Sequence, residues 1–161
     1  MLGDGAMQMN GINGLITVAK VWREWTDPRL VVMVLNNGDL NQVTWEQRAM
    51  EGDPRYLPSQ EVPPFPYARY AELLGLRGLR VDRPEDVGPA WDSALSADMP
   101  TVLEMITDAT VPPMPPHVSA AQMRNFLSAM WHRDPDATAM LVATFRETWD
   151  SLFPPPSTSV H

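Results

Sequence analysis

The amino-acid sequence predicts an α/β fold in which helices cover a parallel sheet, with a helical extension at the C-terminal end. Strand-like apolar runs alternate with helical patterns between residues 10 and 107. Short connections between such elements favour right-handed crossovers and parallel strands. The run "LVVMVL", residues 30–35, is continuously apolar and rich in Val, which is typical of a strand buried on both faces.

Each remaining element follows from a local pattern. Residues 10–25 are expected to form a helix, because apolar side chains recur there at a spacing of three to four. "NNGD" closes the Val-rich strand with turn chemistry. The later elements are a helix at 40–50, a Pro-rich loop at 51–66, a helix at 67–74, a strand at 78–81, a helix from about 83 to 97 with Pro84 in its first turn, and a strand at 101–107.

The sequence after the last strand changes character. We expect one α/β domain at residues 1–110, a stiff Pro-rich connector at 111–118, a two-helix extension at 119–153 and a tail at 154–161. The last helix carries an apolar stripe opposite a face with both acidic and basic residues. Helices that lie on membranes favour Lys and Arg on that face, so packing on the domain or on another subunit is favoured over a lipid surface.

Composition narrows the classes of function. The 161 residues include 12 basic and 20 acidic side chains, for a net charge of −8, and no Cys. An acidic chain lacks the basic stripes that bind nucleic acids, so no nucleic-acid partner is expected. The absence of Cys excludes disulfides and thiolate chemistry and is compatible with a reducing cytoplasm. No apolar run approaches the ~20 residues of a membrane span, and no signal peptide is visible, so we expect a cytoplasmic protein.

Two short motifs predict a site that binds a metal and an anion. Gly3-Asp4-Gly5 opens a helix, and Asn36-Asn37 ends the Val-rich strand. In parallel sheets such motifs lie at the carboxyl edge, where ligands bind. The Asp4 carboxylate, the Asn37 amide and the Asp39 carbonyl offer the oxygen ligands that Mg²⁺ prefers. The N–H groups of Gly5 and Ala6 are expected to face a phosphate.

These motifs resemble the diphosphate-binding half of thiamine diphosphate enzymes. The segments around them, up to "PTVLEMITD", follow in family order over residues 3–108. "PPHVSAAQMRNFLSAMW" is more loosely similar to the tail of the pyruvate oxidase and quinone-dependent pyruvate dehydrogenase branch. The resemblance implies bound thiamine diphosphate and Mg²⁺. It assigns Asp4, Asn37 and Asp39 as metal ligands, and Gly3, Gly5, Ala6 and Leu40 as backbone contacts to the diphosphate.

The resemblance also implies that the chain is truncated at its N-terminus. Family members have an apolar strand before the Gly-Asp-Gly motif, where this chain has only Met1 and Leu2. They also have a pyrimidine-binding domain, whose glutamate activates the cofactor across a subunit interface, and a middle domain that holds FAD in the oxidases. We therefore expect anchoring residues but no catalytic residue here, no FAD on this segment, and little activity without the missing domains or a homologous subunit. The complete enzyme is expected to be a homo-oligomer.

Three functions stay open at this point. The first is pyruvate oxidase-like or dehydrogenase-like decarboxylation of a 2-oxo acid, within a group that includes acetolactate synthase. The second is a decarboxylase without redox chemistry, which FAD content would distinguish. The third is a non-catalytic truncated product or partner subunit that lacks the activating glutamate.

Overall fold

The computed structural model describes residues 1–111, 119–140 and 142. The chain divides into two compact units, which are described separately. Unit one comprises residues 1–40 and 61–109, and unit two comprises residues 41–60 and 110–161. Residues 41–60, which lie within the expected domain 1–110, thus group with the C-terminal part of the chain rather than with the sheet.

Unit one contains a parallel sheet, as the sequence predicts. Its strands are β1 (Leu2–Gly3), β2 (Val31–Asn36), β3 (Arg77–Val81) and β4 (Thr101–Ile106). They lie in the order β1-β2-β4-β3, and every adjacent pair is parallel. Strand β2 starts and ends one residue later than expected, so that Asn36 is its last residue. The carboxyl ends of β1 and β2 therefore lie side by side.

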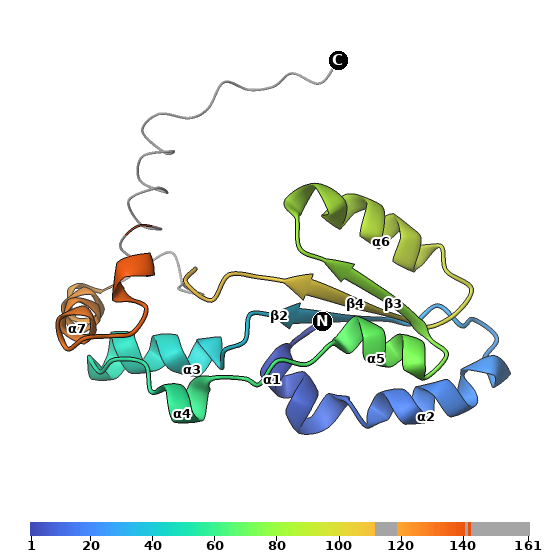
Figure 1. Ribbon diagram of the computed structural model, residues 1–161, viewed down its shortest axis with the longest axis horizontal. Helices are drawn as coiled ribbons and strands as arrows, with labels where there is room; N and C mark the ends of the chain where they lie inside the picture. Colours follow the sequence, from blue (N-terminus) through green and yellow to red (C-terminus); the bar gives the residue numbers. More distant parts are fainter. Residues whose placement is uncertain (112–118, 141, 143–161) are drawn as a thin grey trace, which may run out of the picture. The chain divides into compact units, whose positions relative to one another are not determined.

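Helices cover both faces of this sheet. Figure 1 shows α2 (Gly14–Val21) and α5 (Tyr67–Leu73) on one face and α6 (Val87–Leu95) on the other. The helical structure opens at Asp4, as the Gly3-Asp4-Gly5 motif predicts, with α1 (Asp4–Ala6) and a π-helical turn at Met7–Gly11. The apolar spacing marks a helix only from residue 10, because the glycines and Asn10 before it are weak helix formers.

The core of unit one consists of two apolar clusters, one on each side of the sheet. The first lies under α2 and α5 and includes the buried side chains of Met7, Val34 and Tyr67. The second lies under α6 and is formed by Val81, Leu103 and Met105. Burial of each such side chain contributes about 1.5–3 kcal/mol, so the apolar strands are held from both faces.

Helix α5 approaches strand β3 closely at Gly78. A Cβ atom added to Gly78 would lie 2.7 Å from the carbonyl carbon of Ala68 and would clash with its oxygen as well. Because the obstacle is backbone, no side-chain rotation relieves it. The absence of a side chain at Gly78 therefore sets how tightly α5 packs on the sheet.

Unit two is helical among its described residues. It contains α3 (Asn41–Glu46), a π-helical turn at Gln47–Glu51, α4 (Leu57–Gln60) and α7 (Ala120–Trp131). Ser119 and Gln122 form a capping box at the start of α7, and Trp45 stacks on Phe126 with ring centroids 5.7 Å apart. Helix α4 lies in the stretch expected to be a loop, where its single turn is too short to show a period.

The second helix expected in the extension is only partly described. Residues 137–140 are helical. Residue 142 is helical as well, and residue 141, the rest of the expected helix from 143 on and the tail at 154–161 lie outside the described residues. Within the part of the chain that the structure describes, no helix has the length and apolar character needed to cross a bilayer.

A buried ion-pair network joins the two stretches of unit two. The guanidinium of Arg48 donates to both carboxylate oxygens of Asp134, each at 2.7 Å, and the two side chains are 1% and 0% exposed. The Arg48 guanidinium also donates to the Asp136 carboxylate at 2.7 Å, and the backbone N–H of Arg55 donates to the Asp134 carboxylate at 2.8 Å. Burial alone raises the pKa of Asp134, but hydrogen bonds from Arg48, Arg55 and the Asp136 N–H outweigh it, and the pKa lies below its ordinary value.

Within unit one, the residues on either side of the 41–60 stretch lie next to each other. Asp39 and Glu61 form an antiparallel bridge, and the N–H of Val62 donates to the carbonyl of Gly38 at 3.0 Å. The loop that follows β2 is thus tied to the segment that leads into α5.

The close approach at Gly78 makes a prediction for stability. Gly78→Ala is expected to lower the free energy of unfolding by about 2 kcal/mol or more, because α5 must move off the sheet. Gly88→Ala is the control, since a Cβ at this helical position meets nothing within 4 Å and Ala is the better helix former by about 1 kcal/mol. Urea denaturation measures both, and equal effects would refute the steric argument.

The network predicts a pH dependence of stability. Asp134→Asn should lower the free energy of unfolding at pH 7 by about 3 kcal/mol, because Arg48 loses the more deeply buried of its two carboxylate partners. A carboxylate whose folded-state pKa is lowered stabilises the fold above its unfolded pKa, and this contribution is lost as the pH falls through the folded value. The difference between wild type and variant should therefore shrink below about pH 4. Asp27→Asn, which breaks an exposed pair with Arg29, should change little, and an equal effect of both variants would contradict the prediction.

Candidate functional site

The two motifs singled out in the sequence meet at one edge of the sheet. Asp4 follows β1 directly and Asn37 follows β2 directly. Since Gly3 pairs with Leu35 in the parallel register, the two strands end at the same level. Residues 33 positions apart in the sequence are thereby brought into hydrogen-bonding contact.

The Asp4 carboxylate is the centre of this contact. One oxygen, Oδ2, accepts hydrogen bonds from the N–H groups of Asn37 at 3.1 Å and Gly38 at 2.6 Å. The other, Oδ1, accepts from the N–H of Gly5 at 2.8 Å. The residue is only 2% exposed, so these backbone dipoles, rather than water, compensate its charge. The loop after β2 is consequently fixed to the turn after β1.

The loop after β2 has a tight and specific conformation. Gly38 has a φ of 68°, a left-handed geometry that glycine adopts without steric cost. The Asn37 amide oxygen accepts the N–H of Asp39 at 3.1 Å, which forms an Asx turn. Asp39 is 3% exposed. The oxygens of Asn37 and the backbone of Asp39 therefore lie within one turn of the Asp4 contact.

The predicted backbone contacts occupy different settings. Gly5 is buried against Leu40, whose side chain would clash with a Cβ at Gly5, so these two residues of the predicted set touch. Ala6 is exposed. Gly3 is extended, and a Cβ added to it would meet nothing within 4 Å. The N–H of Gly5, expected to face a phosphate, instead donates to Asp4 Oδ1.

The predicted metal ligands carry the type of donor atom that binds a hard divalent cation. Asp4, Asn37 and the Asp39 carbonyl offer only oxygen atoms, as Mg²⁺ requires. The described residues contain no group of three or more His, Cys, Asp or Glu side chains able to hold a metal. A cation at this edge would thus have the Asp4 carboxylate as its one charged side-chain ligand. Its other ligands would be the Asn37 amide oxygen, the Asp39 carbonyl and oxygens from outside the protein.

A tyrosine that sequence reasoning missed supports the turn from behind. The Tyr67 hydroxyl donates to the Asp4 carbonyl at 3.1 Å and accepts from Gln8 Nε2 at 3.0 Å. Burial raises the pKa of Tyr67 above its ordinary value, the Gln8 hydrogen bond lowers it, and the charges of Asp4 and Glu104 raise it further. Tyr67 and Asp4 are 63 positions apart in the sequence, so no local sequence pattern predicts their contact.

A buried glutamate supports the end of β2. Glu104 lies in β4 and is 1% exposed. Its carboxylate accepts from Asn36 Nδ2 at 2.8 Å and from the N–H of Ala68, in the first turn of α5, at 3.0 Å. The first Asn of the motif therefore braces the sheet, while the second faces the Asp4 loop. A single acid within the apolar run "TVLEMI" was the available signal in the sequence.

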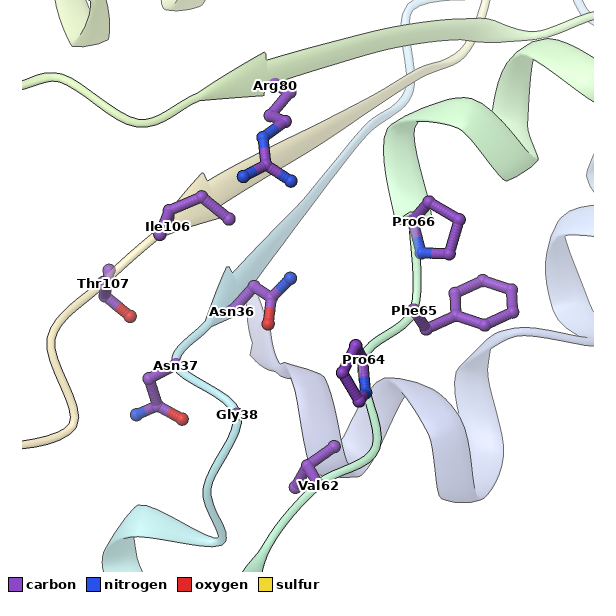
Figure 2. A pocket seen from close by; sticks show the side chains of 10 residues that line it. All are labelled: Asn36, Asn37, Gly38, Val62, Pro64, Phe65, Pro66, Arg80, Ile106 and Thr107. Atoms are coloured by element: carbon purple, nitrogen blue, oxygen red, sulfur yellow. The ribbon is translucent and has the colours of Figure 1, made fainter.

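A pocket of about 430 Å³ opens at the same edge of the sheet. Figure 2 shows the side chains of Asn36 and Asn37 at the end of β2, with Arg80 of β3 above them. Nη1 of Arg80 lies 3.8 Å from Oε1 of Glu104. The other lining residues are Gly38, Val62, Pro64, Phe65, Pro66, Ile106 and Thr107. Of the residues predicted for the site, Asn37 lines this pocket.

Comparisons with known proteins show which proteins this chain is similar to. A putative thiamine pyrophosphate-containing protein of Bacillus subtilis, YdaP, is 30% identical over 101 residues, which are 63% of this chain and 17% of that protein. The mitochondrial acetolactate synthase catalytic subunit of Aspergillus candidus is 33% identical over 84 residues, 52% of this chain and 12% of that subunit.

A solved structure is similar as well. The thiamine diphosphate-dependent 4-hydroxybenzoylformate decarboxylase of Rhodococcus jostii RHA1 matches with a TM-score of 0.56 and 31% identity, over 66% of this chain and 19% of that one. The chain thus spans less than a fifth of the length of each of these relatives.

The match to a protein family covers the sheet and both motifs. The family model described as "Thiamine pyrophosphate enzyme, C-terminal TPP binding domain" matches residues 1–105, where thiamine pyrophosphate, or TPP, is another name for thiamine diphosphate. This range includes Asp4, the Asn36-Asn37 strand end and Glu104. The chain belongs to the family of C-terminal TPP-binding domains of thiamine pyrophosphate enzymes.

Proposed function

We propose that this chain anchors the diphosphate of thiamine diphosphate through Mg²⁺, in an enzyme that acts on 2-oxo acids. The observation that carries the proposal is the Asp4 carboxylate, which holds the Asn37–Gly38 loop by backbone hydrogen bonds. This arrangement places hard oxygen donors from two strand ends beside each other within a TPP-binding domain.

Each residue has a specific role in this proposal. Asp4, Asn37 and the carbonyl of Asp39 hold the metal, and the backbone of Gly3, Ala6 and Leu40 contacts the diphosphate, beside the Gly5 N–H that holds the Asp4 carboxylate. When bound, the cofactor supplies the electron sink for loss of CO₂ from a 2-oxo acid. The residues of this chain bind and orient the diphosphate, and we assign none of them to proton transfer.

The class of substrate rests on the relatives. One is named a decarboxylase of 4-hydroxybenzoylformate and another an acetolactate synthase. Pyruvate is our specific proposal for the 2-oxo acid, on the resemblance of residues 115–131 to the pyruvate oxidase branch. FAD would then be bound by another domain of the complete enzyme. Both an oxidase and a simple decarboxylase release CO₂, so the flavin content of the native protein, isolated from its source, separates them.

Removal of the Asp4 carboxylate tests the anchoring role. In an NMR titration of the ¹⁵N-labelled chain with thiamine diphosphate, the resonances of Gly5, Ala6 and residues 37–40 should shift only when MgCl₂ is also present, and EDTA should reverse the shift. Asp4→Ala should weaken Mg²⁺-dependent binding by at least about tenfold, because even outer partners of metal ligands have effects of this size.

Asp27→Ala, which removes an exposed carboxylate, is the matched control and should bind as the wild type does. Thiamine without its phosphates should cause no Mg²⁺-dependent shift. The anchoring role is wrong if Asp4→Ala binds normally, or if the wild-type chain shows no shift at millimolar cofactor.

A further inference from the structure

Tyr67 reaches the cofactor site from a distant part of the sequence. It is the first residue of α5 and is 1% exposed. Its hydroxyl lies 3.1 Å from the carbonyl oxygen of Asp4. That carbonyl also accepts the N–H of Met7 within the first helical turn. The peptide that links Asp4 to Gly5 is therefore held by a long-range contact as well as by the local helix.

The hydrogen bonds around the hydroxyl fix its direction. Gln8 Nε2 donates to the Tyr67 oxygen at 3.0 Å and to the Pro63 carbonyl at 2.7 Å, which uses both protons of that amide nitrogen. The Tyr67 hydroxyl has one proton to give, and the Asp4 carbonyl receives it.

The tyrosine itself is held in place. Its ring contacts Phe65 with centroids 5.2 Å apart, and the next residue, Ala68, donates its N–H to the buried carboxylate of Glu104. Because the Tyr67 side chain is fixed in this way, its hydroxyl also fixes the position of the Asp4 carbonyl. The Asp4 main chain in turn determines where the Asp4 carboxylate meets the N–H groups of Asn37 and Gly38.

We propose that Tyr67 is a positioning residue for the metal and diphosphate site: its hydroxyl holds the Asp4 peptide so that the carboxylate and the Asn37–Gly38 loop are arranged before the cofactor binds. This inference rests on the proposed function. Preorganisation of this kind increases affinity because less ordering remains to be done on binding.

Tyr67→Phe tests the inference, since it removes only the hydroxyl. In the full chain without ligand, amide hydrogen exchange at Gly5, Asn37 and Gly38 should become about threefold to tenfold faster, the equivalent of one net hydrogen bond. In the NMR titration with thiamine diphosphate and MgCl₂, affinity should fall by a similar factor. Exchange in β4, which the hydroxyl does not touch, should stay as in the wild type.

Tyr70→Phe is the matched control. Tyr70 lies on the same helix and its ring contacts Phe65, so this variant makes the same chemical change away from Asp4. It should leave both readouts unchanged. Gln8→Met, which removes the bonds that orient the hydroxyl, should shift both readouts in the same direction as Tyr67→Phe but less far.

The outcomes separate the two proposals. If Tyr67→Phe exchanges at the wild-type rate at Gly5, Asn37 and Gly38, or binds as the wild type does while Asp4→Ala loses affinity, the role of Tyr67 is wrong and the anchoring function stands. If Asp4→Ala binds normally, the anchoring function is wrong, and the role of Tyr67 in the cofactor site is overturned with it. Equal changes in Tyr67→Phe and Tyr70→Phe would indicate a general loss of packing and would also overturn the inference.

Discussion

The fold of unit one depends on how a buried negative charge is compensated. The Asp4 carboxylate is almost fully removed from water and is held by N–H groups of Gly5, Asn37 and Gly38. Hydrogen bonds to charged groups contribute about 1.5–3 kcal/mol each, and a buried carboxylate without them would be strongly destabilising. This one interaction joins two strand ends and fixes the loop that follows β2, so the site and the fold share the same contact.

Helix α5 is the second support of that contact. Its first two residues reach different partners: Tyr67 contacts the main chain of Asp4, and Ala68 contacts Glu104, which holds Asn36. The ends of β1 and β2 are thus braced by the same helical turn. The close packing of α5 on β3 at Gly78 keeps this turn in position. Residues far from the ligand edge therefore affect its geometry.

The sequence predicts the sheet well because its signals are local. The apolar run at 30–35 and the motifs around Asp4 and Asn37 each have a short pattern, and the rules for parallel sheets bring them to one edge. The contacts of Tyr67 and Glu104 have no such pattern, since they join residues far apart in the chain. The use of the Gly5 N–H by Asp4 itself, and the single turn of α4, also depend on tertiary packing and could not be predicted from spacing.

The bridge between Asp39 and Glu61 has a consequence for the evolution of this domain. Because the chain departs and returns at paired residues, the twenty or so residues between them form an insertion with adjacent ends. Insertions at such points are tolerated, and lengthening a loop whose ends are already joined costs little entropy. The excursion can therefore change in length or composition beyond Leu40 while the strand ends that carry Asp4 and Asn37 stay unaltered, provided that Arg48 keeps its buried partners.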